Sequence, residues 1–137
     1  MAARGVQSTT LQKKCDRWKK VLRLGDWDIV CRYATRAERD DPDRLNGGEN
    51  VAILEECSIP EKIAVIIISR DYFNHEGHGV SWNLDTLILH ELCHIIQKMG
   101  KHGMSKRTEK SSKFIHFEEH ICDSFAAIIY FIYYNKI

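Results

Sequence analysis

The sequence predicts an α+β fold with an N-terminal helix, a small and mostly antiparallel sheet, and two later helices. Three observations support this prediction. Apolar residues recur at helical spacing near both ends of the chain. Between these regions lie three short segments rich in β-branched residues, two of them joined by a turn that contains proline. With 137 residues, the chain is expected to form one domain, residues 1–137.

The first expected element is a helix over residues 8–24, with lysines and arginines on its outer side. Its apolar positions follow helical spacing and are Leu11, Cys15, Trp18, Val21 and Leu22. Gly25 is expected to end this helix. The basic residues are interpreted as a solvated face rather than a nucleic-acid patch, because such runs usually face water.

Three strands are expected at residues 27–34, 51–58 and 63–69. The third is apolar almost throughout, as expected of a strand buried on both faces. A turn at residues 59–62, which includes Pro60, should join the last two strands into an antiparallel hairpin, with 51–58 at the edge. Residues 36–50 are rich in charge and end in Asn-Gly-Gly, so a mobile loop is expected there.

The strongest motif is His90-Glu91-Leu92-Cys93-His94, an H-E-x-x-H pattern within an expected helix over residues 83–99. Histidines four residues apart lie on one face of a helix, so both rings can bind one metal ion, with zinc the first choice. Glu91 can reach a water at that metal and serve as general base. Apolar residues should cluster opposite the histidines: Ile88, Leu89, Leu92, Ile95, Ile96 and Met99.

A second motif, Glu119-His120-Ile121-Cys122-Asp123, offers a carboxylate as the third metal ligand. Glu119 would leave a fourth position open for water, and Asp123 can hold the second ring nitrogen of a ligand histidine. Ala126 and Ala127 should allow close approach of the two helices. An apolar stripe opposite the acidic pair is expected to pack on a common core: Phe114, Phe117, Ile121, Phe125, Ile128 and Ile132.

Together, H-E-x-x-H and E-x-x-x-D resemble the gluzincin metallopeptidases of the thermolysin-like clan, in a minimal single-domain form. The resemblance covers roughly residues 50–130. It implies a zincin-like fold and one zinc ion per chain, bound by His90, His94 and Glu119. It also implies that Glu91 is the catalytic base of peptide-bond hydrolysis and that Asp123 orients a histidine ligand.

The same resemblance implies that an extended peptide pairs with the edge strand over the motif helix, here residues 51–58. The backbone groups of an edge strand can bind a peptide with little regard to its side chains. Glu55 or Glu56 at the rim of such a cleft would favour basic substrate side chains. The alternative is that these two glutamates are exposed and contribute little.

Two other interpretations of the motif remain open. The H-E-L-C-H stretch is also similar to the SprT-like proteases, which act at DNA and use a third histidine, for which His102 is the candidate. The other interpretation is a non-catalytic zinc-binding module that binds or regulates a partner. Weaker candidates near the site are His75, His78, His116 and His120.

The composition limits the binding partners and the cellular compartment that are expected for this chain. The net charge of +1 gives no electrostatic reason for binding nucleic acid or a membrane. The five cysteines form no C-x-x-C pair, so neither a disulfide framework nor a cysteine-ligated zinc is expected. No apolar run reaches the length of a membrane span, and no signal peptide is recognisable. We therefore expect a soluble, cytoplasmic protein with a peptide or protein substrate, as a monomer or weak homodimer.

Overall fold

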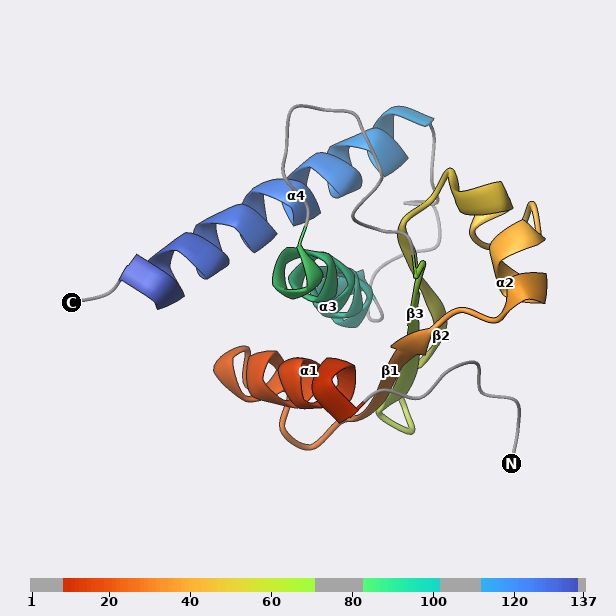
Figure 1. The fold of residues 1–137 in the computed structure, drawn as a ribbon. Coiled ribbons are helices and arrows are strands. Elements are labelled where there is room, and N and C mark those ends of the chain that lie inside the picture. Colours follow the sequence, from red (N-terminus) through yellow and green to blue (C-terminus); the bar gives the residue numbers. More distant parts are fainter. Residues whose placement is uncertain (1–8, 71–82, 102–111, 136–137) are drawn as a thin grey trace.

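The structure, a computed structural model, describes residues 9–70, 83–101 and 112–135. The described part is α+β, as predicted (Figure 1). Its elements, in chain order, are α1 (Thr9–Val21), β1 (Asp28–Tyr33), α2 (Arg36–Asp40), the 3₁₀ turn η1 (Asn46–Gly48), β2 (Ala52–Ser58), β3 (Ile63–Ile68), α3 (Leu84–Lys101) and α4 (Ser112–Asn135). No helix among the described residues is both long enough and apolar enough to cross a membrane.

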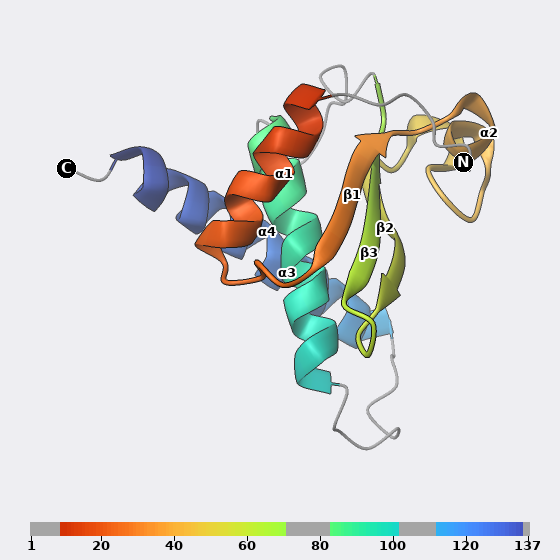
Figure 2. The same ribbon diagram turned by 90° about the horizontal axis from the view of Figure 1, so that it is seen from below.

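The helices are arranged in layers around the sheet. Helices α1 and α3 cover one face of the sheet, and α4 packs against the side of α3 that faces away from it (Figures 1 and 2). The short α2 and η1 lie toward the other face, where Leu45 packs with Ala34 and Ile67. Helix α3 therefore has neighbours on two sides, whereas α4 lies at the outside of the molecule.

The sheet has the strand order β1-β3-β2. The apolar β3 lies at the centre, as its composition predicted, and pairs antiparallel with β2 in the expected hairpin. However, β1 pairs parallel with β3, so the sheet is mixed rather than mostly antiparallel. The chain between β1 and β3 contains both α2 and β2. Because β2 runs back along the sheet, β3 begins at the same end as β1 and can pair with it in parallel.

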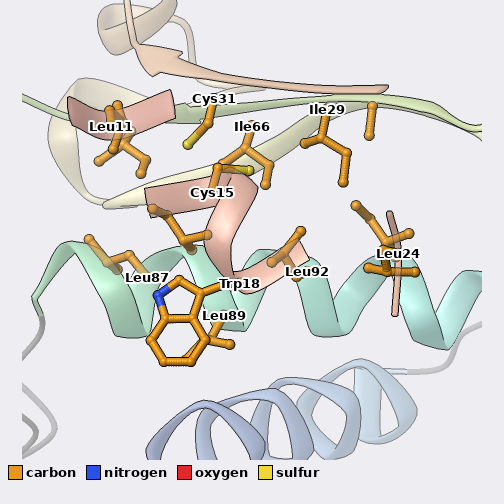
Figure 3. Close-up of a cluster of buried hydrophobic side chains, with 14 of the residues drawn as sticks. Leu11, Cys15, Trp18, Leu24, Ile29, Cys31, Ile66, Leu87, Leu89 and Leu92 are labelled. Carbon is orange, nitrogen blue, oxygen red and sulfur yellow. The ribbon is translucent and has the colours of Figure 1, made fainter. Parts of the chain in front are cut away.

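The main core fills the space between the sheet and the two helices that cover it. Trp18 of α1, Ile66 of β3 and Leu92 of α3 are fully buried at its centre (Figure 3). Cys15 and Cys31 also lie in this core, and all five cysteines are free thiols. The apolar face predicted for the motif helix is confirmed over most of its length, except that Met99 is exposed.

The expectation of a mobile loop at residues 36–50 was wrong, because α2 and η1 form within it. Thr35 caps α2 in a capping box: its hydroxyl accepts from the backbone N–H of Glu38, and Glu38 accepts from the backbone N–H of Thr35. Arg32 donates to both carboxylate oxygens of Glu38, at 2.8 and 2.9 Å. The capping signal was present in the sequence, but the partner on β1 was not recognisable without the fold.

The predicted helix ends differ by a few residues from those observed. Helix α1 ends at Val21 rather than at residue 24, because the chain turns at Arg23, whose φ is +61°. Helix α3 continues past residue 99, where it was expected to end, to Lys101. Differences of this size are usual at helix termini, where the last turn lacks backbone partners.

Candidate metal centre

Helix α3 is held firmly at its N-terminal end. The side chain of Asn83 accepts from the backbone N–H of Thr86, and the Thr86 hydroxyl accepts from that of Asn83. In the first turn, buried Asp85 accepts from the indole N–H of Trp18 at 2.8 Å and from Lys14 at 3.2 Å. These contacts tie α3 to α1 and fix the helix that carries the H-E-x-x-H motif.

The side chains of His90, His94 and Glu119 converge between α3 and α4. The Nε2 atoms of the two histidines are 3.1 Å apart. One oxygen of Glu119 lies 3.0 Å from Nε2 of His90, and the other lies 2.9 Å from Nε2 of His94. These are the three residues predicted to bind a metal, and they come together from two helices far apart in the sequence.

The spacing of these atoms suits a small metal ion. Ligand bonds of about 2.1 Å in a tetrahedron place ligand atoms roughly 3.4 Å apart. The separation of the two Nε2 atoms, 3.1 Å, and the distance from each of them to its nearer Glu119 oxygen, 2.9 or 3.0 Å, are a few tenths of an ångström shorter. A slight opening would therefore admit zinc. The Glu119 side chain is half exposed, so a fourth position on its side can be reached by water.

Both histidines have a partner for the ring nitrogen that points away from the centre. Asp123, one turn after Glu119, places Oδ1 2.8 Å from Nδ1 of His90, in a contact that is electrostatic rather than a linear hydrogen bond. The sequence indicated that Asp123 would contact one of the two histidines but not which one. The structure places it at His90.

Gln97 is a polar partner of the site that sequence reasoning missed. Its amide nitrogen donates to the backbone carbonyl of Glu118 at 3.2 Å, so its oxygen must be the atom 3.0 Å from Nδ1 of His94. An amide oxygen only accepts, which means that Nδ1 of His94 carries a proton and that Nε2 is the nitrogen left to bind a metal. The position of Gln97 three residues after His94, on the same side of the helix, could have indicated this role.

Glu91 lies beside the three converging groups without joining them. Its carboxylate is almost completely buried, 4.0 Å from Nε2 of His90. Burial raises the pKa of Glu91, opposed by the nearby histidines and assisted by Glu119 and Asp123. A raised pKa and a position next to the ligands are both suited to a group that takes and returns a proton.

The electrostatics of the metal-free site balance two positive rings against three carboxylates. Burial alone would lower the pKa of His90, but the hydrogen bond to Glu119 and the charges of Glu91 and Asp123 raise it to about 9. The pKa of His94 is raised for the same kind of reason, and hydrogen bonds from both rings lower the pKa of Glu119. Without metal, protons on the histidines therefore hold the carboxylate in place.

Two thiols line the inner side of the site. Cys122, fully buried on α4, has its sulfur 3.6 Å from Nδ1 of His94 and contacts Cys93. The hydrogen bond from Cys122 lowers the pKa of Cys93. The sulfur of Cys122 lies near Nδ1, the ring nitrogen that points away from the ligand atoms. Cys93 is buried.

The prediction for the apolar face of α4 was wrong at three of its positions, whereas Phe125 is half buried and the side chains of Phe114 and Phe117 lie outside the described part. Ile121, Ile128 and Ile132 are exposed, while Cys122 and Ala126 face α3 and are fully buried. The acidic pair and the apolar stripe lie on opposite sides of this helix, and only one side can face α3. The close approach expected at Ala126 is confirmed, whereas its neighbour Ala127 is exposed.

Other histidines proposed for the site are not brought into it by the described structure. His120 is exposed on α4, next to Glu119 in sequence but on another side of the helix. The side chain of His116 lies outside the described part, as do His75, His78 and His102.

The two glutamates of β2 do not line a cleft over α3. Glu55 sits at an irregularity in the β2–β3 pairing and forms an ion pair with Arg44, with 2.7 Å between Oε2 and Nε. Glu56 pairs with Val65, whose side chain belongs to the small core on the face away from α3. The expected preference for basic substrate side chains therefore has no support in this geometry.

The chain matches no known family, no curated protein and no solved structure in comparisons with each of these groups. The geometry of the described side chains is therefore the basis for the function assigned below.

Proposed function

We propose that this protein is a zinc-dependent peptidase whose metal is bound by His90, His94 and Glu119. The observation that carries the proposal is the convergence of two Nε2 atoms and one carboxylate within about 3 Å, with buried Glu91 at their side. Two neutral imidazoles and one carboxylate form a donor set typical of catalytic zinc sites, which keep one position for water or substrate.

The chain's own residues would divide the chemistry of peptide hydrolysis among them. Bound zinc would polarise the substrate carbonyl and lower the pKa of the attacking water. Glu91 would accept the proton of that water and pass it to the departing amine nitrogen, so that the bond to carbon breaks as the amine becomes neutral. Asp123 and Gln97 would hold the two histidine rings in the orientation that directs Nε2 at the metal.

The edge of the sheet is the proposed site for the peptide backbone. Within the described part, β2 pairs only with β3, so its outer edge is available for a further strand. Leu54 and Cys57 of β2 lie on the α3 side of the sheet and pack against the main core. A peptide paired with this edge would lie beside the motif helix, with specificity from its backbone rather than from Glu55 or Glu56.

Metal content and hydrolysis test the proposal directly. The purified chain should hold one zinc ion, and the His90→Ala/His94→Ala double variant should hold none. Glu91→Gln should keep zinc and fold but lose hydrolysis of a peptide library, whereas Glu56→Gln, the same change at an exposed position on β2, should keep both. Full hydrolysis by Glu91→Gln would reject Glu91 as the base. Zinc binding without hydrolysis by the unaltered protein would favour the non-catalytic module.

The identity of the third ligand separates the gluzincin-like site from the SprT-like alternative. If Glu119 is the ligand, Glu119→Ala should lose most of its zinc affinity and His102→Ala should retain it. The reverse result would assign the third position to His102. Amide exchange with a slow peptide-like zinc inhibitor should then show protection at β2 and α3; protection confined to α1 would contradict the edge-strand site.

A further inference from the structure

Helix α4 presents an apolar stripe to the outside of the molecule. Of the nine exposed large hydrophobic residues in the described part, six lie on α4, so the exposure is concentrated on one element. Four of the six form one stripe, and their exposed fractions are 41% for Ile121, 55% for Ile128, 64% for Phe131 and 56% for Ile132. At helical spacing these positions span about 100° of the helix surface, the width of a stripe that usually faces a core.

This stripe is turned away from the rest of the molecule. The opposite side of α4 carries Glu119, Cys122 and Ala126, which face α3. Toward the C-terminal end, Tyr133 packs edge-on against Trp18 of α1, with ring centroids 4.8 Å apart. Figures 1 and 2 show α4 as the outermost helix, with its C-terminal half reaching beyond α3. Monomeric proteins seldom expose an apolar surface of this size without a partner.

The charges around the stripe favour a protein over a membrane as its partner. From Ser124 to Asn135 the sequence has no charged residue, so nothing on this length of α4 attracts an anionic lipid surface. The charged groups just before it, Glu119 and Asp123, are acidic and pair with the histidines on the side of α4 that faces α3, so they do not attract such a surface either. Helices that lie in a membrane interface usually carry lysines and arginines beside their apolar face.

We propose that the stripe joins two copies of this chain into a dimer, with their α4 helices antiparallel and crossing near Ile128. In this arrangement, Ile128 meets Ile128 of the second copy, and Phe125 meets Phe131 of the second copy. Because the segment is uncharged, the approach brings no like charges together. A two-fold contact of this kind needs only one patch, which every copy carries.

The area available fits a weak dimer. Each exposed side chain of the stripe leaves about 100 Å² of apolar surface, so four residues and the partly buried Phe125 contribute roughly 500 Å² per copy. Two copies would bury on the order of 1,000 Å², the lower limit for a specific interface. The metal ligands lie on the other side of α4, so dimer formation should depend neither on zinc nor on the peptidase activity proposed above.

Sedimentation of the full chain at concentrations from about 1 micromolar to roughly several hundred micromolar tests the dimer. The unaltered protein should shift from monomer to dimer as concentration rises, with or without chelator. Ile128→Glu places two carboxylates at the crossing point and should raise the dissociation constant at least about tenfold. Met99→Glu, a matched change at a similarly exposed apolar residue on α3, should leave the constant unchanged.

A cross-link tests the antiparallel crossing itself. Because the native cysteines are buried or half buried, an Ile128→Cys variant should form an intermolecular disulfide on mild oxidation by oxidised glutathione, whereas Met99→Cys should not. A monomer at all concentrations would overturn the proposal, as would a dimer unaffected by Ile128→Glu. Binding of the monomer to vesicles of neutral lipid, without dimerisation, would overturn it in favour of a membrane surface.

Discussion

Helices α3 and α4 carry the same kind of pattern but are packed differently. Each has a polar pair four residues apart and an apolar stripe on the opposite side. On α3 both sides are buried: Leu92 is fully buried and His90 is 8% exposed. On α4 the polar side faces inward, with Cys122 fully buried, while Ile128 on the apolar side is 55% exposed.

The difference follows from the number of neighbours that each helix has. Helix α3 lies between the sheet and α1 on one side and α4 on the other. Helix α4 has its main contact with α3, and the ion pairs of Glu119 and Asp123 with the histidines decide which side it presents. Small residues at Cys122 and Ala126 let the helices approach closely. Amphipathic periodicity therefore indicates two distinct faces, but the number of packing partners decides which of them is buried.

The largest effect that tests this comparison is expected in the core of α3. Leu92→Ala should lower the free energy of unfolding by about 2–5 kcal/mol, because it leaves a cavity in a fully packed core. Ile128→Ala, measured in dilute solution where the chain is monomeric, should change it by no more than about 0.5 kcal/mol. Chemical denaturation of both variants measures the difference; equal losses would mean that α4 is as deeply buried as α3.

A second pair of variants compares the contact that joins α3 to α1 with the contact that joins α4 to α1. Asp85→Ala should cost about 1–3 kcal/mol, because the buried indole N–H of Trp18 loses its acceptor. Tyr134→Phe removes only an exposed hydrogen bond from Arg17 to α4 and should cost less than about 0.5 kcal/mol. Thermal unfolding of the two variants should therefore separate them clearly, and a larger loss for Tyr134→Phe would contradict this assignment.

The contact between α3 and α4 at Gln97 should affect metal binding more than folding. Gln97→Leu removes the acceptor for Nδ1 of His94 and should weaken zinc affinity about 10–100-fold. Gln97→Glu keeps an acceptor and should lose less. Lys98→Leu alters the next, exposed residue and serves as the control. Zinc competition with a chelator of known affinity gives the constants, and unchanged affinity in Gln97→Leu would remove Gln97 from the site.

The smallest expected effect is the pH dependence of the metal-free protein. The pKa of His90 is raised to about 9 in the folded chain, against 6.5 for its ordinary value. The resulting stabilisation is complete below pH 6.5 and is lost as pH rises through about 9. The half-exposed Glu119 is screened by water, so the loss should be about 1–2 kcal/mol.

Denaturation of the chelated protein at several pH values measures this loss. His90→Gln should show a smaller decrease over the same range, because its side chain does not titrate. A metal-free stability that increases between pH 6.5 and 9 would contradict the proposed role of protonated histidines between α3 and α4.

The sequence alone determined most of the local elements and the residues of the candidate site. Spacing of four residues placed His90 with His94 and Glu119 with Asp123, because the helical repeat brings such residues to one face. The run from Ile63 to Ile68 identified the central strand, because β-branched residues without polar interruption suit a strand covered on both sides. These properties depend on the backbone repeat and on side-chain type, which the sequence contains.

The tertiary structure decided everything that depends on which partners are near. It set the parallel pairing of β1 with β3, and it ordered α2 through the contact of Arg32 with Glu38. It directed the acidic side of α4 rather than its apolar side toward α3, and it brought Gln97 to His94 and to the backbone of Glu118. Each of these contacts joins separate elements or opposing helix faces, and a repeat within one element carries no information about its neighbours.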